Sequence, residues 1–456
     1  MEKRFDAIIV GTGQAGPSLA NRLTQAGMQV AIIERARVGG TCVNTGCTPT
    51  KALVANAKAI HYVRSAAPFG IKINSFSIDM PAIKARKDSI VNESSSGLKQ
   101  WLLGMKGCTF IEGEAVFTDP HTVCVNGEFL HAERIFINVG CRAAIPNIPG
   151  LADIPYLTNS SMMDLDDLPE HLLIIGGGYI ALEFAQMYHR FGSSVTVLQR
   201  NSYLMPKEDT DISEEIRKIL EKNGIQILTD VRQIKVLNGS KQGDIRLDVG
   251  KQTIAGSHLL LATGRVPNTD GLGLDKAGVK KDEKGFIKID DWLQTTQSHI
   301  WALGDCNGHG AFTHTSYNDF EIVAANLLDG GSRKVSDRIP IYALYTDPPL
   351  GRVGMTEREA RKSGRRLSMA KMPMTRVARA REKSETDGFM KIITDNETNQ
   401  ILGASLLGTG CDEVVQMIAD VIYAKAPYTS ICKGVHIHPT VCELIPTLLE
   451  GLQPLK

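Results

Sequence analysis

A short apolar run that passes straight into a glycine-rich turn and then into a helical pattern leaves a polypeptide few ways to fold. This succession occurs twice in the 456 residues, about 165 positions apart. In the first copy, an apolar run at residues 6–10 precedes a turn at 11–16, and a helical pattern at 17–26 leads to a second apolar run at 29–34. Because two strands joined by a crossover helix are parallel neighbours, this segment predicts a βαβ unit.

The second copy has the same order of elements. Residues 172–175 form the apolar run, 176–178 the turn, and a helix that continues to Phe191 leads to a strand at 194–199. The two copies predict an α/β protein with two Rossmann-like dinucleotide-binding domains. After residue 339, strand-rich runs flank helical segments, which predicts a further α+β domain at the C-terminus.

The first turn has the spacing of a dinucleotide-binding motif. Glycines at 11, 13 and 16 let the backbone approach a pyrophosphate at the positive end of the helix. Glu34 ends the next strand, where a carboxylate can accept hydrogen bonds from a ribose hydroxyl. We therefore predict a dinucleotide site here, with a glycine-rich turn that binds nothing as the alternative.

The second turn differs in the residue that follows its second strand. Gly176 and Gly178 form the turn and Glu183 lies inside the helix, but the strand ends in Gln199 and Arg200 instead of an acid. An arginine can pair with a 2′-phosphate, which a carboxylate would repel. NADPH is therefore predicted as the electron donor, with NADH possible. The alternative is that Arg200 is only a solvated charge at a strand end.

Between the two units lies the sequence GGTCVNTGCTPTK, residues 39–51, with two cysteines five positions apart. No histidine or second cysteine pair lies nearby to complete a tetrahedral metal site around Cys42 and Cys47. Two thiols at the start of a helix have lowered pKa values and can cycle between dithiol and disulfide. The pattern favours a redox pair over metal ligands or two inert cysteines.

Charge and composition exclude other classes of function. Lys and Arg number 51 against 50 Asp and Glu, a net charge of +1, so no broad field attracts nucleic acid or an anionic membrane. The first apolar run is too short for a signal peptide and no later run would span a bilayer, so we expect a cytoplasmic enzyme. Nine cysteines, an odd number in a long chain, argue against a secreted disulfide framework.

These motifs, with three later ones, are similar to those of the FAD-dependent pyridine nucleotide-disulfide oxidoreductases, the family of glutathione reductase, dihydrolipoamide dehydrogenase and mercuric reductase. The later motifs are ATGRVPN at 262–268, IWALGD at 300–305 and HIHPTVCE at 436–443. The resemblance covers nearly the whole chain. It implies an FAD domain of residues 1–145 and 270–335, an NAD(P) domain of residues 146–269, and a dimerisation domain of residues 336–456.

The resemblance also implies how the redox pair works. Cys42 would be the interchange thiol that meets the acceptor, and Cys47 the charge-transfer thiol beside the flavin. His438, backed by Glu443, would be the acid-base group that keeps Cys42 a thiolate. In this family that histidine comes from the partner subunit, so a homodimer is implied.

Two further catalytic residues, Lys51 and Glu183, would form an ion pair beside the flavin, and Tyr179 would gate the nicotinamide pocket. The residues expected to hold FAD are Gly11, Gly13, Gly16, Glu34, Arg35, Gly40, Thr41, Lys51, Ala115, Gly140, Arg265, Asp305 and Thr313. Those expected to hold NADP are Gly176, Gly178, Tyr179, Ile180, Glu183, Arg200 and Gly264.

The acceptor stays open, as a small disulfide or thiol-reactive molecule. The redox motif is most similar to mercuric reductase-like proteins, although mercuric reductases proper have Tyr in place of His438 and end in a cysteine pair that residues 451–456 lack. Two arginines that glutathione reductases use fall on Asn21 and Glu321, and dihydrolipoamide dehydrogenases generally carry an acid at the Gln199-Arg200 position. Reductases of the reactive-chlorine and hypothiocyanous acid response, NAD(P)H oxidase-like diaphorases and non-enzymatic redox-sensing flavoproteins are further alternatives.

The remaining cysteines are expected to be structural. Small buried residues are predicted at Cys108, Cys124, Cys141 and Cys411. Cys306, next to Asp305, and Cys442, expected one helical turn after His438, are predicted to pack as well, with an auxiliary thiol as the alternative. The histidines at 309, 314, 436 and 438 fit no ligand spacing well, so no metal site is predicted.

Overall fold

The computed structural model describes residues 2–241 and 243–455, and its N-terminal part is a seven-stranded sheet. Strands β1, β2, β3, β6 and β16 pair in parallel, and β4 and β5 extend the sheet antiparallel. Their order is β3 (Cys108–Glu112), β2 (Val30–Glu34), β1 (Glu2–Val10), β6 (Glu128–Ile137), β5 (Thr122–Val125) and β4 (Val116–Asp119), with β16 (Ile300–Ala302) beside β6.

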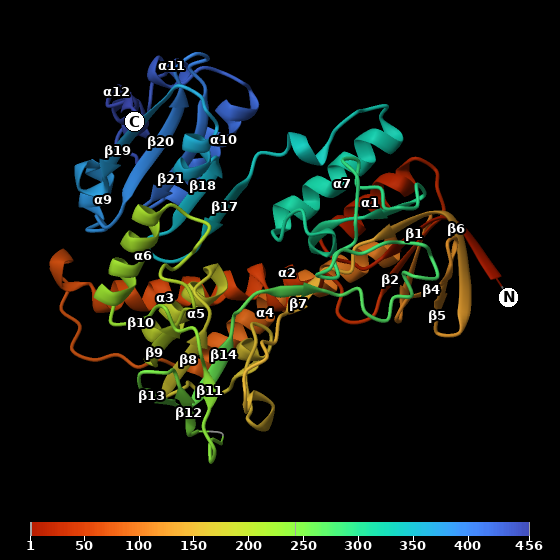
Figure 1. Cartoon of the computed structure of the whole chain (residues 1–456), viewed down its shortest axis with the longest axis horizontal. Coiled ribbons are helices and arrows are strands. Elements are labelled where there is room, and N and C mark those ends of the chain that lie inside the picture. Colours follow the sequence, from red (N-terminus) through yellow and green to blue (C-terminus); the bar gives the residue numbers. More distant parts are fainter. Residues whose placement is uncertain (1, 242, 456) are drawn as a thin grey trace.

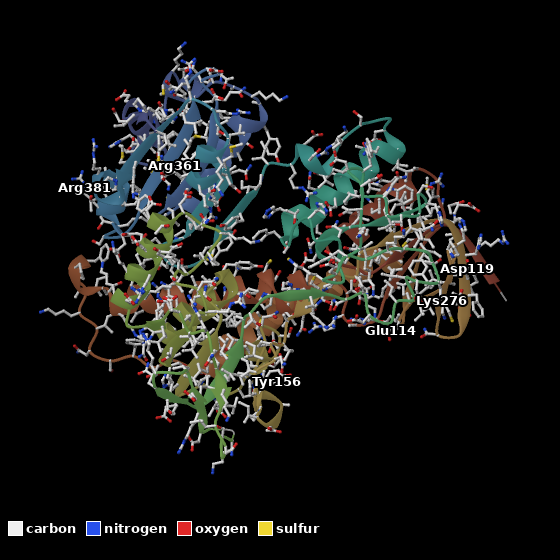
Figure 2. All side chains as sticks on the ribbon, in the orientation of Figure 1. Glu114, Asp119, Tyr156, Lys276, Arg361 and Arg381 are labelled. Carbon is white, nitrogen blue, oxygen red and sulfur yellow. The ribbon has the colours of Figure 1, made fainter. Side chains whose placement is uncertain are left out.

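Helices α1 (Ala15–Gln25) and α7 (Thr313–Leu328) lie together along this sheet (Figure 1). Two tight connections lie at its outer edge: β4 ends at Asp119, labelled in Figure 2, and Asn126 and Gly127 connect β5 to β6. Asn126 and Gly127 both have positive φ, 52° and 80°, as a tight hairpin turn requires. Strand β1 begins at Glu2, earlier than predicted, because it pairs with β6 along its whole length.

The second nucleotide-binding unit is a separate parallel sheet. Its four strands, in order, are β10 (Gln226–Leu228), β9 (Ser194–Leu198), β8 (His171–Ile175) and β14 (His258–Leu261). Helices α5 (Tyr179–Phe191) and α6 (Thr210–Lys222) belong to it, as does the antiparallel sheet β11 (Lys235–Val236), β12 (Ile245–Asp248) and β13 (Thr253–Gly256). The chain enters and leaves this region through β7 (Cys141–Ala143) and β15 (Arg265–Pro267), which pair with each other.

The C-terminal part is a six-stranded antiparallel sheet with helices packed on it. In order, its strands are β17 (Ile341–Leu344), β18 (Leu350–Gly354), β21 (Ile401–Leu407), β20 (Phe389–Asp395), β19 (Leu367–Pro373) and β22 (Gln453–Pro454). Its helices are α8 (Glu357–Lys362), α9 (Ala378–Glu382), α10 (Cys411–Tyr423), α11 (Thr429–Cys432) and α12 (Ile445–Glu450). The α/β architecture with a distinct C-terminal α+β unit is therefore as predicted.

Helices α2 (Gly40–Thr45), α3 (Cys47–Arg64) and α4 (Met80–Gly104) connect the three parts. Helix α3 runs beside the second unit and contacts α5 (Figure 1). Leu53 of α3 shares one buried cluster with Phe184 of α5 and Leu350 of β18, so a single hydrophobic core spans all three parts. Among the described residues, no helix is long and apolar enough to cross a membrane. The domain boundaries given above stay a prediction.

Candidate active site

The two motif cysteines meet at a junction of helices. Cys42 lies in α2, Cys47 begins α3, and Thr313 begins α7. The Thr313 hydroxyl donates to Cys42 Sγ at 3.0 Å and lies 3.2 Å from Cys47 Sγ. Both cysteines are free thiols in this structure. One hydroxyl from a helix more than 260 positions away therefore contacts both sulfur atoms.

The electrostatics of the two thiols differ strongly. The hydrogen bond from Cys42 lowers the pKa of Cys47 to about 6, and the Thr313 hydroxyl and the Lys51 charge add to this effect against the opposing effect of burial. The same contact, together with burial, raises the pKa of Cys42. At neutral pH, Cys47 is therefore the thiolate and Cys42 keeps its proton.

An ion pair supports this part of the site. Lys51 Nζ lies 2.8 Å from Glu183 Oε2, and the Glu183 side chain is 3% exposed. The backbone N–H of Tyr345 donates to Glu183 Oε1 at 2.9 Å, and the Tyr345 ring centroid lies 4.5 Å from Lys51 Nζ. Residues from α3, α5 and the segment after β17 thus hold one positive charge near Cys47.

Most of the predicted catalytic and cofactor-binding residues line one cavity of about 1060 Å³, a size that holds a large ligand. Those that line it are Gly11, Gly13, Glu34, Arg35, Gly40, Thr41, Cys42, Cys47, Lys51, Ala115, Gly140, Tyr179, Ile180, Glu183, Arg265, Asp305 and Thr313. Those that do not are Gly16, Gly176, Gly178, Arg200, Gly264, His438 and Glu443.

The FAD end of this cavity fits a dinucleotide. A Cβ at Gly11 would lie 2.3 Å from the Asn138 carbonyl oxygen, and a Cβ at Gly16 would lie 2.3 Å from the Gly11 carbonyl oxygen, so only glycine allows this packing. In the part of the chain that the structure describes, Asn138 Nδ2 and Arg265 Nε are buried in the cavity wall without hydrogen-bond partners. Buried donors of this kind are rare, and phosphate and hydroxyl oxygens would satisfy them.

The two acids predicted to bind FAD both line the cavity. Glu34 Oε2 accepts hydrogen bonds from the Thr12 backbone N–H at 3.0 Å and from the Thr12 hydroxyl at 2.6 Å. Asp305 lies 3.6 Å from Arg265 Nε, and burial raises its pKa although the arginine charge opposes this. Both carboxylates keep lone pairs for a ligand.

Arg35 extends outward from the same wall. It pairs with Glu114 at 3.0 Å, and both side chains are more than half exposed. Figure 2 labels Glu114 on the outer side of the N-terminal part.

The predicted NADP residues surround the start of α5. A Cβ at Gly176 would lie 2.2 Å from the Ala262 carbonyl oxygen, and Gly264 has a φ of +135°. Arg200 is exposed, two residues after the end of β9. Tyr179 begins α5, its ring centroid lies 5.4 Å from that of Phe312, and burial raises its pKa to about 12. Tyr179 thus stands between the second glycine turn and the cavity.

His438 and Glu443 contact each other but not the redox pair. His438 Nδ1 lies 3.0 Å from Glu443 Oε2, and the His438 side chain is 74% exposed. The expectation that His438 and Cys442 share a helix face is wrong: His438 lies in an irregular segment, and a 3₁₀ turn begins only at Cys442. Pro439 explains this, because it disfavours helical backbone in the preceding residue.

The other cysteines give no sign of a thiol function. Cys306 is buried and donates to the Leu303 carbonyl at 3.3 Å, and burial raises its pKa and raises that of Cys141 to about 12. Cys141 and Cys411 are buried as predicted, whereas Cys108 and Cys124 are only partly buried. Cys432, which no sequence pattern singled out, is exposed.

One carboxylate cluster among the described residues has the spacing of a metal site. It consists of Asp209, Asp211 and Glu357. The ammonium of Lys391 lies 2.8 to 3.1 Å from all three carboxylates and supplies the positive charge that such a cluster needs.

Three residues of the site were missed by the sequence analysis. Asn138 carried a usable signal, since it is a polar residue directly after the apolar strand β6. Phe312 and Tyr345 carried none, because their partners Tyr179, Lys51 and Glu183 lie far away in the sequence.

Comparisons with known proteins agree along the whole chain. Residues 5–319 match the family described as pyridine nucleotide-disulphide oxidoreductase, and residues 341–449 match its dimerisation domain. The probable pyridine nucleotide-disulfide oxidoreductase RclA of Escherichia coli (strain K12) is 37% identical over 98% of this chain and 99% of its own. A mercuric reductase of Staphylococcus aureus is 33% identical over 95% of this chain and 81% of its own.

Similar proteins also include a dihydrolipoyl dehydrogenase and proteins of solved structure. A dihydrolipoyl dehydrogenase of Thermus scotoductus is 32% identical over 99% of this chain and 98% of its own. A structure described as the Cu(II) complex of the HOCl-induced flavoprotein disulfide reductase RclA from Escherichia coli has a TM-score of 0.89 at 36% identity, and the match covers 97% of this chain and 99% of that one.

Proposed function

This chain belongs to the pyridine nucleotide-disulphide oxidoreductase family, whose members depend on FAD and take electrons from NAD(P)H, and we propose that it is an NADPH-dependent reductase of a small oxidised-sulfur acceptor. The observation that carries the proposal is the asymmetry of the redox pair: Cys47 is acidic, with a pKa of about 6, while Cys42 stays protonated. A dithiol with one stable thiolate and one transferable proton is suited to disulfide exchange.

FAD, when bound, accepts a hydride from the nicotinamide and passes two electrons to the cysteine pair. Gly11 and Gly13 would leave room for its pyrophosphate, and Glu34 would accept hydrogen bonds from its ribose. Asn138 Nδ2 and Arg265 Nε, which have no hydrogen-bond partner among the described residues, would donate to it. Lys51, fixed by Glu183, would supply positive charge at the redox pair.

The sulfur chemistry starts at Cys42. His438 of the partner subunit would take the Cys42 proton, and the Cys42 thiolate would attack a sulfur of the acceptor. The first leaving thiolate would take the proton from His438, and Cys42 would remain in a mixed disulfide. The Cys47 thiolate would then attack Cys42 Sγ, which closes the Cys42–Cys47 disulfide and releases the second thiolate; two electrons have then passed to the acceptor.

The proposal extends to the oligomeric state of the protein and to its location in the cell. The match to the dimerisation domain supports a homodimer, in which Glu443 would hold the His438 ring for the partner's redox pair. The nine free cysteines suit a reducing compartment, so we propose the cytoplasm.

Two classes of acceptor have support from relatives. The similarity to RclA, described as HOCl-induced, favours an oxidised-sulfur species formed under chlorine stress. The similarity to mercuric reductases favours a thiol-binding metal ion as the second candidate.

The test is NADPH oxidation with glutathione disulfide, lipoamide, hypothiocyanous acid, Hg(II) and Cu(II) in turn. We expect turnover with a small oxidised-sulfur compound, complete loss in Cys42→Ser, and a long-wavelength absorbance on anaerobic reduction that Cys47→Ser lacks. Turnover confined to the metal ions would favour the second candidate. No flavin reduction by NADPH or NADH would refute both.

A further inference from the structure

Glu208, in the loop before α6, has a buried carboxylate that the proposed reaction does not use. Its side chain is 2% exposed. Oε1 accepts a hydrogen bond from the Tyr342 hydroxyl, while Oε2 has no hydrogen-bond partner within residues 2–241 and 243–455 and lies 3.5 Å from Arg352 Nε. A buried carboxylate that is only partly paired destabilises the fold, so this arrangement calls for a role beyond packing.

The Tyr342 ring begins a row of aromatic side chains that ends at Tyr179. It stacks on Phe312 with the centroids 5.3 Å apart and the planes 6° apart. Phe312 in turn packs against Tyr179 at 5.4 Å. Phe312 and Tyr179 both line the cavity that holds Cys47, so Glu208 fixes the far end of a row whose near end faces the site.

Glu208 is also attached to the second glycine turn through the backbone. Its N–H donates to the Met205 carbonyl at 2.8 Å, and the Met205 N–H donates to the Gly177 carbonyl at 2.8 Å. Tyr179 follows Gly177 by two residues. Glu208 is therefore connected to the nucleotide-binding turn in two ways: through the aromatic side chains of the row, and through these two backbone hydrogen bonds.

We propose that Glu208 is a positioning residue that, through Tyr342 and Phe312, sets the Tyr179 ring relative to the glycine turn and so controls nicotinamide entry. The inference rests on the proposed function, which assigns the nicotinamide to this part of the cavity.

The charged groups around Glu208 make its interactions with Tyr342 and Arg352 depend on pH. The titratable groups that face it from the surrounding elements are Tyr342, Arg352, Lys391, Asp209 and Glu359. Burial raises the pKa of Glu208 to about 7, which the Arg352 charge opposes. Above this pH the carboxylate is charged, attracts Arg352 and accepts a strong hydrogen bond from Tyr342; below it, both interactions weaken.

The experiment mixes the FAD-loaded dimer rapidly with NADPH or NADH and follows flavin reduction across neutral pH. The wild-type rate should fall as the pH drops through about 7. Glu208→Gln keeps a hydrogen-bond acceptor without the charge and should abolish this dependence. Tyr342→Phe should slow flavin reduction about tenfold, an effect of the size seen between energetically coupled residues. The effect should be equal with NADPH and NADH, because both carry the nicotinamide.

Glu214→Gln, an exposed glutamate on α6, is the matched control and should behave as wild type. A wild-type pH dependence in Glu208→Gln, or an unchanged rate in Tyr342→Phe, would overturn the inference. If Glu208→Gln does not fold, the rate of flavin reduction in Tyr342→Phe alone tests the inference. Failure of the proposed function looks different, since the wild-type flavin would then not be reduced by either donor at any pH.

Discussion

Thr313 contacts both thiols of the redox pair. Its hydroxyl donates to Cys42 Sγ and lies beside Cys47 Sγ, while Cys42 itself stabilises the Cys47 thiolate. Removing the hydroxyl should raise the pKa of Cys47 above its present value of about 6, because one stabilising partner is lost.

The prediction is that Thr313→Val shifts the pH midpoint of the long-wavelength absorbance of the two-electron-reduced enzyme upward. In the wild type, this absorbance should appear as the pH rises through about 6. A pH titration of the anaerobically reduced protein measures both midpoints. The same midpoint in both proteins would mean that the hydroxyl does not act on the thiolate.

Arg200 is the residue expected to distinguish NADPH from NADH. Arg200→Glu places a negative charge where a 2′-phosphate would bind, so the Michaelis constant for NADPH should rise by about tenfold or more. NADH lacks that phosphate and serves as the internal control. Steady-state rates with each donor test this, and an equal loss with both would remove Arg200 from the phosphate site.

Asp347 connects three secondary-structure elements. It lies between β17 and β18 and pairs with Arg190 of α5 at 2.9 Å and with Lys58 of α3 at 3.3 Å. Burial would raise its pKa, but the Arg190 and Lys58 charges hold it below its ordinary value of 3.8. The three parts of the chain are thus joined by buried charge as well as by their shared hydrophobic core.

Asp347→Asn should lower the free energy of unfolding by about 3–5 kcal/mol at neutral pH, because it leaves Arg190 buried without its partner. A carboxyl with a lowered folded-state pKa stabilises the fold above its unfolded pKa and loses this effect as the pH falls through the folded value. The difference from wild type should therefore shrink in acid. Urea unfolding at several pH values measures it, with Asp387→Asn, at an exposed pair, as the control; a difference independent of pH would contradict the assignment.

The elements were predictable where the signal is local. The glycine turns, the strands beside them and the Asn126-Gly127 hairpin follow from short-range rules, and the structure has them. The helical position expected for His438 is wrong, because Pro439 disfavours helical backbone in the residue before it. The pairs Asp347–Arg190 and Glu208–Tyr342 join residues 157 and 134 positions apart, so no local pattern could reveal them.

In the folded chain, the predicted acid-base residue His438 lies apart from the redox pair. Within one chain, His438 is exposed and does not line the cavity of the redox pair. Beside it, Val435 is fully exposed and Ile437 is 79% exposed, an unusual state for apolar side chains in a monomer. A partner subunit that receives this segment would bury them and bring His438 to Cys42.

His438→Ala should slow turnover with a disulfide-type acceptor by about 10²- to 10⁴-fold, the range of general acid-base assistance. Flavin reduction by NADPH should stay near normal, and Hg(II) reduction should lose far less, because a metal ion needs no proton on release. Comparing steady-state rates with rapid-mixing rates separates these steps. Full rates with every acceptor would remove His438 from the mechanism.

In the proposed dimer, Cys42 of one subunit works with His438 of the partner subunit. Co-expression of Cys42→Ser and His438→Ala chains under two tags yields hybrid dimers in which one of the two sites has both native residues. Purified hybrids should recover about half of the wild-type rate with the disulfide-type acceptor, because one site of two is intact, while each parent homodimer should be nearly inactive. Hybrids as inactive as their parents would contradict this arrangement, because the two residues would then have to act within one chain.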